Sequence, residues 1–178
     1  DCSPSRWVID FFNRSENQSS LYHRPFDRIV DSVKPERLQK NQASYRTCWW
    51  QFAHKGEAWK TATTNLDEVL VIALVSKTVM PMRVPTGQVF SHKLAVFACD
   101  DYVLDATLSS SLHTMWVLRY TSTMRKDVNY SPSDVFETFP RPEPTEELET
   151  IGRTLDTERR EIMLRRDLGL TKLYNLVN

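Results

Sequence analysis

The segment Glu68–Ala98 constrains the fold of this 178-residue chain more strongly than any other part of the sequence. It contains short apolar runs, rich in Val, separated by turns that carry proline or glycine. Thr86 and Gly87 form the expected tip of a hairpin. Short strands with short connections favour a small antiparallel or mixed sheet. The runs predict four strands: Glu68–Val75, Val79–Val84, Gln88–Ser91 and Lys93–Ala98.

Apolar residues at three- and four-residue spacing predict helices on both sides of this segment. The periodicity covers residues 16–33, where Pro25 is expected to start a second helix. After the strands, Asp100 and Asp101 are expected to cap a helix. The next helix is predicted over Ser109–Tyr120, with an apolar face formed by Leu112, Met115, Trp116 and Tyr120.

Two aromatic stretches in the first third of the chain resemble strands in their composition. RWVIDF, Arg6–Phe11, is short and mostly apolar, and it predicts a buried strand. CWWQF, Cys48–Phe52, contains two adjacent tryptophans. In a strand, Trp49 and Trp50 would point to opposite faces, so only one of them would face a given core.

A proline-rich stretch, YSPSDVFETFPRPEP (Tyr130–Pro144), precedes a long predicted helix. Within it, Val135–Phe139 is predicted to be a short strand that the prolines terminate. Thr145 is expected to cap the helix, whose acidic start and basic end match the helix dipole. Gly169 is its expected C-cap. The expected apolar stripe comprises Leu148, Ile151, Leu155, Ile162 and Met163.

Together these elements predict an α+β fold with a small twisted, mostly antiparallel or mixed sheet, flanking helices and a C-terminal helical arm. We expect one domain over residues 1–144 and the arm over residues 145–178. Lys and Arg number 23, as do Asp and Glu, so bulk charge predicts no nucleic-acid partner. No apolar run reaches the roughly 18 residues that a membrane span needs.

The start of the chain and its cysteines bear on its origin. The opening DCSPSRWVIDF has no initiator Met and no signal-like apolar stretch, so we expect part of a longer protein. Three widely spaced cysteines suit reduced thiols in a cytosol. Because no CxxC pair occurs, we expect no zinc site.

Motifs for catalysis are mostly absent from the sequence. Only four glycines occur, without GxGxxG or a P-loop, so no phosphate-cradling loop is predicted. Asp67, Glu68 and Lys77 could serve a metal-dependent nuclease or hydrolase, but a solvated surface explains them more simply. Ser109 and His113 could pair as nucleophile and base, yet no orienting carboxylate or oxyanion loop accompanies them. We therefore expect no catalytic residue and no metal ligand.

A local excess of cations marks the predicted strands. Between residues 76 and 97 there is no acidic residue, and the basic ones are Lys77, Arg83, His92 and Lys93. Arg119 precedes a further polar loop in which Arg125 and Lys126 outnumber Asp127. Basic loops of this kind suit DNA, where Lys and Arg contact phosphates and polar tips contact base edges. An ordinary solvated β-surface explains the same charges.

Eight sequence elements, in a fixed order, resemble one enzyme family. Together they are similar to the C-terminal part of MmeI-like (type IIL) and related Eco57I-type restriction–modification DNA methyltransferases. The resemblance covers essentially the whole chain. The elements are RWVIDF, KPER, TCWWQF, LVIALVSK, TGQVFSHKLAVFA, LSSSLHTMWV, the Tyr-Ser and FETFPRP pair, and GLTKLYNL.

The resemblance implies a target-recognition module that reads double-stranded DNA for a fused N-terminal methyltransferase domain. In that family the methyltransferase domain binds S-adenosylmethionine and methylates the exocyclic amine of adenine. Its signature, Asn/Asp-Pro-Pro-aromatic, is missing, since this chain has no Pro-Pro dipeptide. We therefore expect no cofactor in this chain, S-adenosylmethionine in the missing catalytic domain, and a location in the bacterial cytoplasm.

The resemblance also implies which residues contact DNA. Family members read base pairs with side chains a few residues before the Tyr-Ser element, which places the expected base readers at Arg125, Asp127 and Asn129. Arg donates to guanine, and Asp accepts from the amino group of cytosine. An exposed, mutually screened Arg–Asp pair is the alternative. The expected phosphate contacts are Lys77, Arg83, Lys93 and Arg119.

Two other functions stay open. One is the stand-alone metal-dependent nuclease or hydrolase described above. The other is a protein-interaction module built on the predicted Thr145–Asp167 helix, whose apolar stripe could pair with another subunit.

Overall fold

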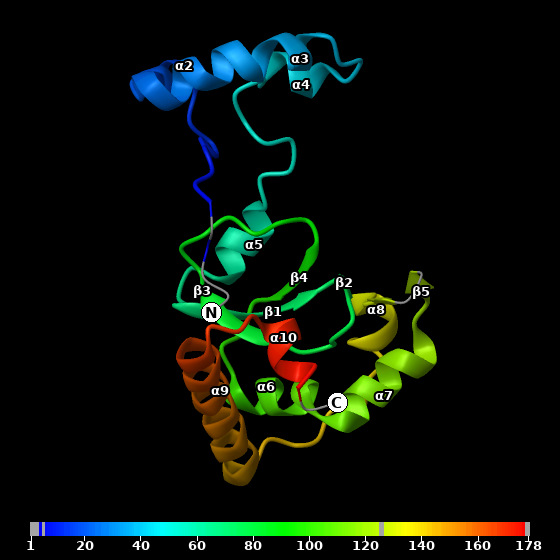
Figure 1. Cartoon of the computed structure of the whole chain (residues 1–178). Helices are drawn as coiled ribbons and strands as arrows, with labels where there is room; N and C mark the ends of the chain where they lie inside the picture. Colours follow the sequence, from blue (N-terminus) through cyan, green and yellow to red (C-terminus); the bar gives the residue numbers. More distant parts are fainter. Residues whose placement is uncertain (1–3, 5, 125–126, 177–178) are drawn as a thin grey trace. The chain divides into compact units, whose positions relative to one another are not determined.

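The computed structural model describes Pro4, residues 6–124 and residues 127–176 (Figure 1). The chain divides into two compact units. The helical unit comprises Ser5–Thr61, and the sheet unit comprises Asp1–Pro4 together with Ala62–Asn178. The domain boundary that we expect after residue 144 stays a prediction.

Short helices build the helical unit. Ser15 starts the first of them in a capping box with Gln18. The apolar face of the second helix contributes Ile29 to a small core that also buries Phe11 and Trp49. The helices are α1 (Glu16–Ser20), α2 (His23–Ser32), α3 (Lys34–Leu38), α4 (Ala43–Thr47) and α5 (Glu57–Ala62).

The strand predicted at Arg6–Phe11 is wrong, and Cys48–Phe52, whose side-chain directions were considered for a strand, forms none either. Arg6–Phe11 has no strand pairing in the described part of the chain, and its Trp7 side chain is fully exposed. Trp49 and Trp50 follow α4 in a turn, where their rings pack edge to face with centroids 6.0 Å apart. A strand needs a neighbour for its backbone hydrogen bonds, and the short helices of this unit supply none.

Six strands in the described part of the sheet unit form two antiparallel sheets of three strands each. The first sheet has the order β3-β1-β4, and the second has the order β2-β6-β5. The predicted α+β class with small antiparallel sheets is therefore confirmed. The strands are β1 (Glu68–Ala73), β2 (Val75–Ser76), β3 (Met82–Pro85), β4 (Leu94–Phe97), β5 (Thr123–Met124) and β6 (Asp127–Asn129).

Strand β1 lies between β3 and β4 and pairs with both of them. Leu70 is opposite Arg83 on one side and Phe97 on the other. The hairpin predicted at Thr86–Gly87 is wrong, because β3 and β4 occupy opposite edges of β1 and do not pair with each other. The run Gln88–Ser91 likewise forms no strand.

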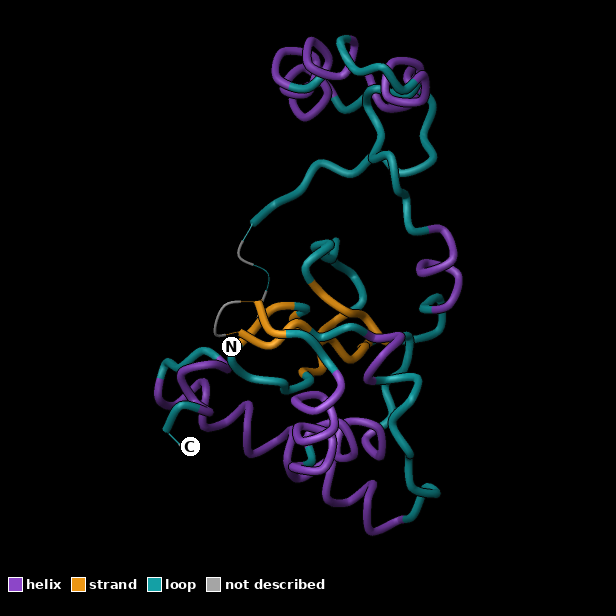
Figure 2. Tube along the Cα trace, turned by 90° about the vertical axis from the view of Figure 1, so that its right-hand side faces the viewer, coloured by secondary structure: helices purple, strands orange, loops and turns teal. Residues whose placement is uncertain are grey.

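The longer helices of the sheet unit, α6, α7 and α9, lie on one side of its strands (Figures 1 and 2). Two predicted caps are confirmed: Asp101 accepts a hydrogen bond from the Val103 backbone at 2.7 Å, and Thr145 accepts one from Leu148 at 3.2 Å. The helices are α6 (Tyr102–Ser109), α7 (Ser111–Tyr120), α8 (Pro132–Val135), α9 (Glu146–Arg166) and α10 (Leu170–Tyr174).

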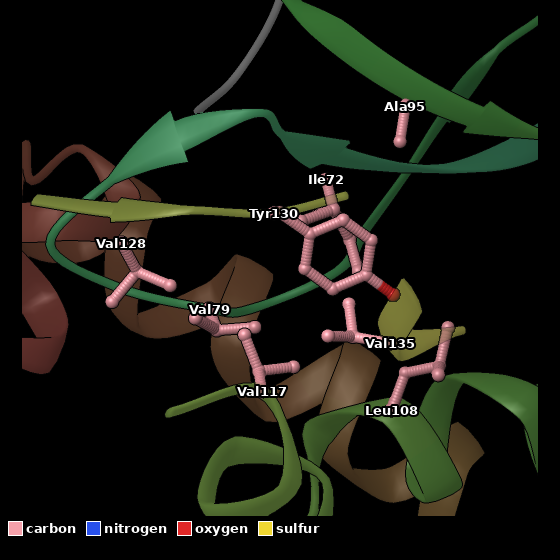
Figure 3. Close-up of a cluster of buried hydrophobic side chains, with 8 residues drawn as sticks. All are labelled: Ile72, Val79, Ala95, Leu108, Val117, Val128, Tyr130 and Val135. Carbon is pink, nitrogen blue, oxygen red and sulfur yellow. The ribbon is translucent and has the colours of Figure 1, made fainter. Parts of the chain in front are cut away.

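The main core lies between the strands and helices α6 to α8. Helix α7 contributes Val117 and His113 to the interior, while Leu112 is 69% and Met115 is 66% exposed, so its predicted apolar face is wrong. The periodicity indicated one stripe along α7, but the elements that pack against this helix bury a neighbouring stripe. Figure 3 shows the core residues Ile72, Val79, Ala95, Leu108, Val117, Val128, Tyr130 and Val135.

The proline-rich stretch after the strands folds differently from its prediction. Pro132 lies in the first turn of α8, a position where its fixed backbone angle favours a helix, so the strand predicted at Val135–Phe139 is wrong. Phe136 packs on Phe97 of β4 with ring centroids 4.5 Å apart. Phe139 packs on His113 at 4.9 Å.

Helix α9 packs against α6 through a face that is charged as well as apolar. Ile151 from the predicted stripe is half exposed. The close approach depends on Gly152, because a Cβ atom there would lie 2.0 Å from the backbone oxygen of Tyr102. The buried residues of α9 are Gly152, Asp156, Arg159 and Met163, which share one face at helical spacing.

Ion pairs connect α9 to α6 and to the first sheet. Arg159 donates to the Pro81 backbone oxygen at 2.5 Å and to Ser109 at 3.0 Å. Arg160 donates to Glu68 at 3.0 Å. We call this network the charged seam, and its members are Glu68, Arg83, Asp105, Asp156, Arg159 and Arg160.

The end of α9 is formed by Asp167, which adopts the left-handed backbone conformation with φ of 50°. Gly169, the predicted C-cap, instead precedes α10.

Candidate nucleic-acid interface

Strand β6 places two of the three predicted base readers on the same face. Its central residue, Val128, is 8% exposed and belongs to the main core. Successive side chains of a strand point to opposite faces, so Asp127 and Asn129 point away from that core. Both are partly exposed. Arg125 lies outside the described residues, and its role stays a prediction.

Asn129 is held by the segment that follows α7. Its backbone N–H donates to the Ser122 oxygen at 3.1 Å, and its side-chain amide donates to the Ser122 hydroxyl at 3.3 Å. The Thr121 hydroxyl donates to the Asn129 backbone oxygen. These bonds fix the strand and orient the Asn129 side chain.

Lys77 reaches the same face through the pairing of β2 with β6. Val75 is opposite Asn129, and Ser76 is opposite Val128. Continuing this antiparallel register by one residue places Lys77 beside Asp127. Lys77 is exposed. The structure therefore brings a predicted phosphate contact next to a predicted base reader, although about 50 residues separate them in sequence.

Lys93 lies on the other side of the β1–β2 connection. The Leu74 N–H donates to the Lys93 backbone oxygen at 2.8 Å, and the Leu74 oxygen accepts from the Tyr130 N–H at 2.7 Å. Through these two bonds the backbone of Leu74 connects the segments that carry Lys93 and Tyr130. The Lys93 side chain is exposed.

Arg119 lies in the last turn of α7 and is exposed. It precedes by two residues Thr121, whose hydroxyl bonds β6. Lys77, Lys93 and Arg119 thus lie around the elements that carry Asp127 and Asn129. We use the name β6 face for Lys77, Lys93, Arg119, Asp127 and Asn129; the strand alternation places Asp127 and Asn129 on one side, the register adds Lys77, and Lys93 and Arg119 are exposed cations on neighbouring segments.

Arg83 does not belong to this set, because its guanidinium group is buried in the charged seam. The side chain is 6% exposed and donates twice to one carboxylate oxygen of Glu68, at 3.0 and 3.3 Å. It also donates to the Asp100 backbone oxygen and lies over the Tyr102 ring at 4.0 Å. A phosphate has no access to a group enclosed in this way, so we leave Arg83 out of the interface and assign it a structural role.

The segment after β6 is anchored by a buried pair of side chains. Tyr130 is 2% exposed, and its hydroxyl donates to Nε2 of His113 at 3.3 Å. Nδ1 of His113 donates to the Leu108 backbone oxygen at 2.9 Å, a pattern that assigns the neutral ring. Burial lowers the pKa of His113 and raises the pKa of Tyr130. Figure 3 shows the Tyr130 ring among the core side chains beneath the strands.

The contacts of Ser109 and His113 exclude the two residues as a catalytic nucleophile and base. The Ser109 hydroxyl donates to Asp105 at 3.2 Å and accepts from Arg159 at 3.0 Å. Both nitrogens of His113 bond other partners, and the ring is fully buried. His113 therefore has a structural role.

The nuclease alternative is not favoured by the surroundings of Glu68. One of its carboxylate oxygens accepts from Arg83 and the other from Arg160, each at 3.0 Å. Glu68 is the first residue of β1 and Lys77 follows β2, so the two residues lie at opposite ends of the β1–β2 segment. Among the described residues, no group of three or more His, Cys, Asp or Glu side chains is arranged to hold a metal ion.

The helix-mediated interaction module is not favoured either. Much of the α9 face that could serve a partner is already packed on α6 within the sheet unit.

Among the described residues, no helix is both long enough and apolar enough to cross a membrane.

Residues missed by the sequence analysis complete the β6 face. Ser122 orients Asn129, and Val75, which is 42% exposed, is opposite Asn129 across the strand pair. The sequence around Ser122 and Val75 does not indicate this role, because β2 has only two residues and its partner strand is more than 50 residues away.

Comparisons with known proteins agree with this arrangement. No curated protein matches the chain. A solved structure of the type IIL restriction–modification enzyme MmeI in complex with DNA has a similar fold, with a TM-score of 0.63 at 16% sequence identity. The similarity covers 80% of this chain and 19% of that one, so this chain spans about a fifth of its length. The family model described as "MmeI, target recognition domain" matches residues 3–143. The chain therefore belongs to the family of MmeI target recognition domains.

Proposed function

We propose that this chain reads the sequence of double-stranded DNA on behalf of a larger bacterial restriction–modification enzyme that methylates adenine. The observation that carries the proposal is the β6 face, where Asp127 and Asn129 point away from the core with exposed cations around them. Membership in a family of target recognition domains supports the same function.

The chemistry of the β6 face suits base reading. Strands β5 and β6 pair antiparallel at one side of the second sheet, and a pair of antiparallel strands can enter the major groove of DNA. There the carboxylate of Asp127 would accept a hydrogen bond from the amino group of cytosine. Arg125, which lies outside the described residues, would donate to guanine.

Asn129 is suited to adenine. Bidentate recognition of adenine uses one amide N–H and the amide oxygen. The bond to Ser122 occupies one of the two N–H groups of Asn129, so the set that adenine needs is still present. Ser122 would fix which way this set points.

Lys77, Lys93 and Arg119 would contact phosphates and set the position of the β6 face on the duplex. The methylation itself belongs to a separate, fused methyltransferase domain, into which the target adenine would be flipped. We place S-adenosylmethionine in that domain, because the Asn/Asp-Pro-Pro-aromatic signature that the resemblance associates with methylation does not occur in this sequence. The cytoplasm, where bacterial DNA lies, is the proposed location.

The test selects preferred duplexes from a randomised DNA library with the wild-type chain and with five variants. Arg125→Ala, Asp127→Asn and Asn129→Ala should each change the preferred base at one position. Lys93→Gln should lower the affinity for all sequences alike. Asp134→Asn, which alters an exposed carboxylate of α8, is the matched control and should change neither property. If the selected sequences are the same for all six proteins, the β6 face is not the reading surface.

A further inference from the structure

The zero net charge of the chain conceals an uneven distribution between its two units. The helical unit, Ser5–Thr61, contains ten Lys and Arg against six Asp and Glu, a net charge of +4. The sheet unit contains thirteen Lys and Arg against seventeen Asp and Glu, a net charge of −4. The unit that carries the proposed base readers is therefore acidic overall, and the basic unit is the one without them.

Within the helical unit the cations gather around helices α3 and α4. The twenty residues from Arg37 to Gly56 include no Asp or Glu. Their basic residues are Arg37, Lys40, Arg46 and Lys55, with His54 as a further donor. Within the helical unit, this stretch therefore carries positive charge without a nearby acidic residue of its own.

Contacts between the two helices hold this element in one shape. Arg46 of α4 donates to the backbone oxygens of Lys40 and Asn41, at 2.7 and 2.8 Å, and so fixes the loop between the helices. The Arg37 guanidinium of α3 lies over the Tyr45 ring of α4, 4.6 Å from its centroid. We call Lys34–Thr47 the α3–α4 hairpin.

The outward residues of the α3–α4 hairpin are hydrogen-bond donors. Lys40, Asn41, Gln42 and Ser44 are exposed, and so is part of Arg46. The Lys40 ammonium is paired with Glu36 at 3.3 Å, but both side chains are more than half exposed, and such pairs contribute little energy. Amides, hydroxyls and cations together form the usual set for contacts to the sugar–phosphate backbone.

We propose that the α3–α4 hairpin is a second DNA-contacting surface, which binds the phosphates of double-stranded DNA without reading its sequence. Lys40 and Arg46 supply the charge, and Asn41, Gln42 and Ser44 supply further donors. This inference rests on the proposed function, since it presumes that the chain binds DNA. The acidic sheet unit would be repelled by DNA, which is a polyanion. The basic helical unit would supply the sequence-independent attraction that offsets this repulsion. A protein partner is less well matched, because Leu38, 49% exposed, is a single apolar side chain on the hairpin, and the loop from Gln39 to Ser44 adds no large aromatic or apolar anchor of the kind that dominates protein interfaces.

The decisive variant is Lys40→Gln, because the Lys40 side chain supports no buried contact. Arg46→Gln is a second variant, interpreted only if circular dichroism shows an unchanged helix content, since Arg46 also holds the loop. Lys172→Gln, which removes an exposed lysine of α10 in the sheet unit, is the matched control. All are made in the full chain.

Fluorescence anisotropy then measures the affinity for random-sequence and for preferred duplexes over about 50 to 200 mM salt. For each lost phosphate contact, the slope of log affinity against log salt should fall by about 0.9, and the affinity near 100 mM should fall roughly tenfold for both duplexes. The control should match the wild type. A wild type that binds no DNA overturns the proposed function and this inference with it. A wild type that binds with sequence preference, beside an unchanged Lys40→Gln slope, overturns the inference alone and leaves the proposed function standing.

Discussion

The charged seam and the β6 face contain the same kinds of residue in opposite surroundings. Arg83 and Lys93 are ten residues apart, and both were expected to contact phosphates. Arg83 is 6% exposed and bonded to Glu68, Asp156 and a backbone oxygen, whereas the Lys93 side chain is exposed. The sign of a charge therefore says little about its role until its solvent exposure is known.

Burial reverses what each group contributes. Removing one partner of a buried ion pair leaves an uncompensated charge and costs about 3 to 5 kcal/mol, whereas exposed pairs contribute about 1 kcal/mol or less. Substitutions in the charged seam should thus affect stability, and substitutions on the β6 face should affect binding. Four substitutions, from the largest expected effect to the smallest, test this division.

Gly152→Ala should cause the largest loss of stability, about 5 kcal/mol, which would unfold much of the sheet unit. Its Cβ would lie 2.0 Å from the Tyr102 backbone oxygen, so α9 would have to move away from α6 and disrupt the charged seam. Urea unfolding followed by circular dichroism measures the change. Gly87→Ala is the control, because no atom lies within 4 Å of a Cβ there, and a comparable loss in both variants would contradict the close-packing argument.

Arg83→Met should destabilise the chain by about 4 kcal/mol, since it leaves Glu68 and Asp156 without a cation that they now share. Lys93→Met, the exposed counterpart, should change the free energy of unfolding by less than about 0.5 kcal/mol. The same denaturation experiment compares the two variants. Equal effects would mean that burial does not separate the two regions.

Asp105→Asn should alter how stability depends on pH. Burial raises the pKa of the Asp105 carboxyl to about 6, and Asp156 adds to the rise, while Arg159 and Ser109 oppose it. Because the folded-state pKa lies above the ordinary value of 3.8 for an aspartate, the stability contributed by this group is complete below pH 3.8 and is lost as pH rises through 6.

Asparagine does not titrate, so the stability of Asp105→Asn relative to the wild type should increase by on the order of 3 kcal/mol between pH 4 and pH 7. Urea unfolding at several pH values measures this difference. A difference that stays constant with pH would show that the Asp105 carboxyl keeps an ordinary pKa.

Tyr130→Phe should have the smallest effect, a loss of about 1 kcal/mol. It removes the hydroxyl that donates to Nε2 of His113 but keeps the ring that fills the core beneath β6. The ring maintains the strand, so the DNA preference should be unchanged. Thermal unfolding together with the DNA selection checks both expectations, and a changed preference would mean that the hydroxyl, besides the ring, positions the base readers.

Local signals predicted much of the fold where the partners of a residue are its neighbours. The caps of α6 and α9 were predicted correctly because Asp101 and Thr145 bond backbone groups only two or three residues away. Strand β1 was predicted because its continuous apolar run is buried on both faces. The strand predicted at Val135–Phe139 is wrong because Pro132 starts helix α8. Proline favours the first turn of a helix, whereas the prediction used the later prolines only as the end of a strand.

The candidate site could be predicted only in part for the same reason. Asp127 and Asn129 came from a resemblance in a short motif, and the alternation of β6 places both on the outer face. The position of Lys77 beside them depends on the pairing of β2 with β6, and no local pattern encodes that pairing. The burial of Arg83 depends on Asp156, which lies more than 70 residues away in α9.

By itself, then, the sequence determined the α+β class, the main strand, the helix caps and the family of the chain, because these follow from short-range periodicity, hydrogen bonding and motif order. The tertiary structure alone decided which cations are enclosed and which are exposed. That choice depends on contacts such as Arg160 with Glu68, which span 92 residues. A buried charge is stable only where an opposite charge lies beside it. In this chain the opposite charge comes from a segment that is distant in sequence, and the order of residues does not show which segment that is.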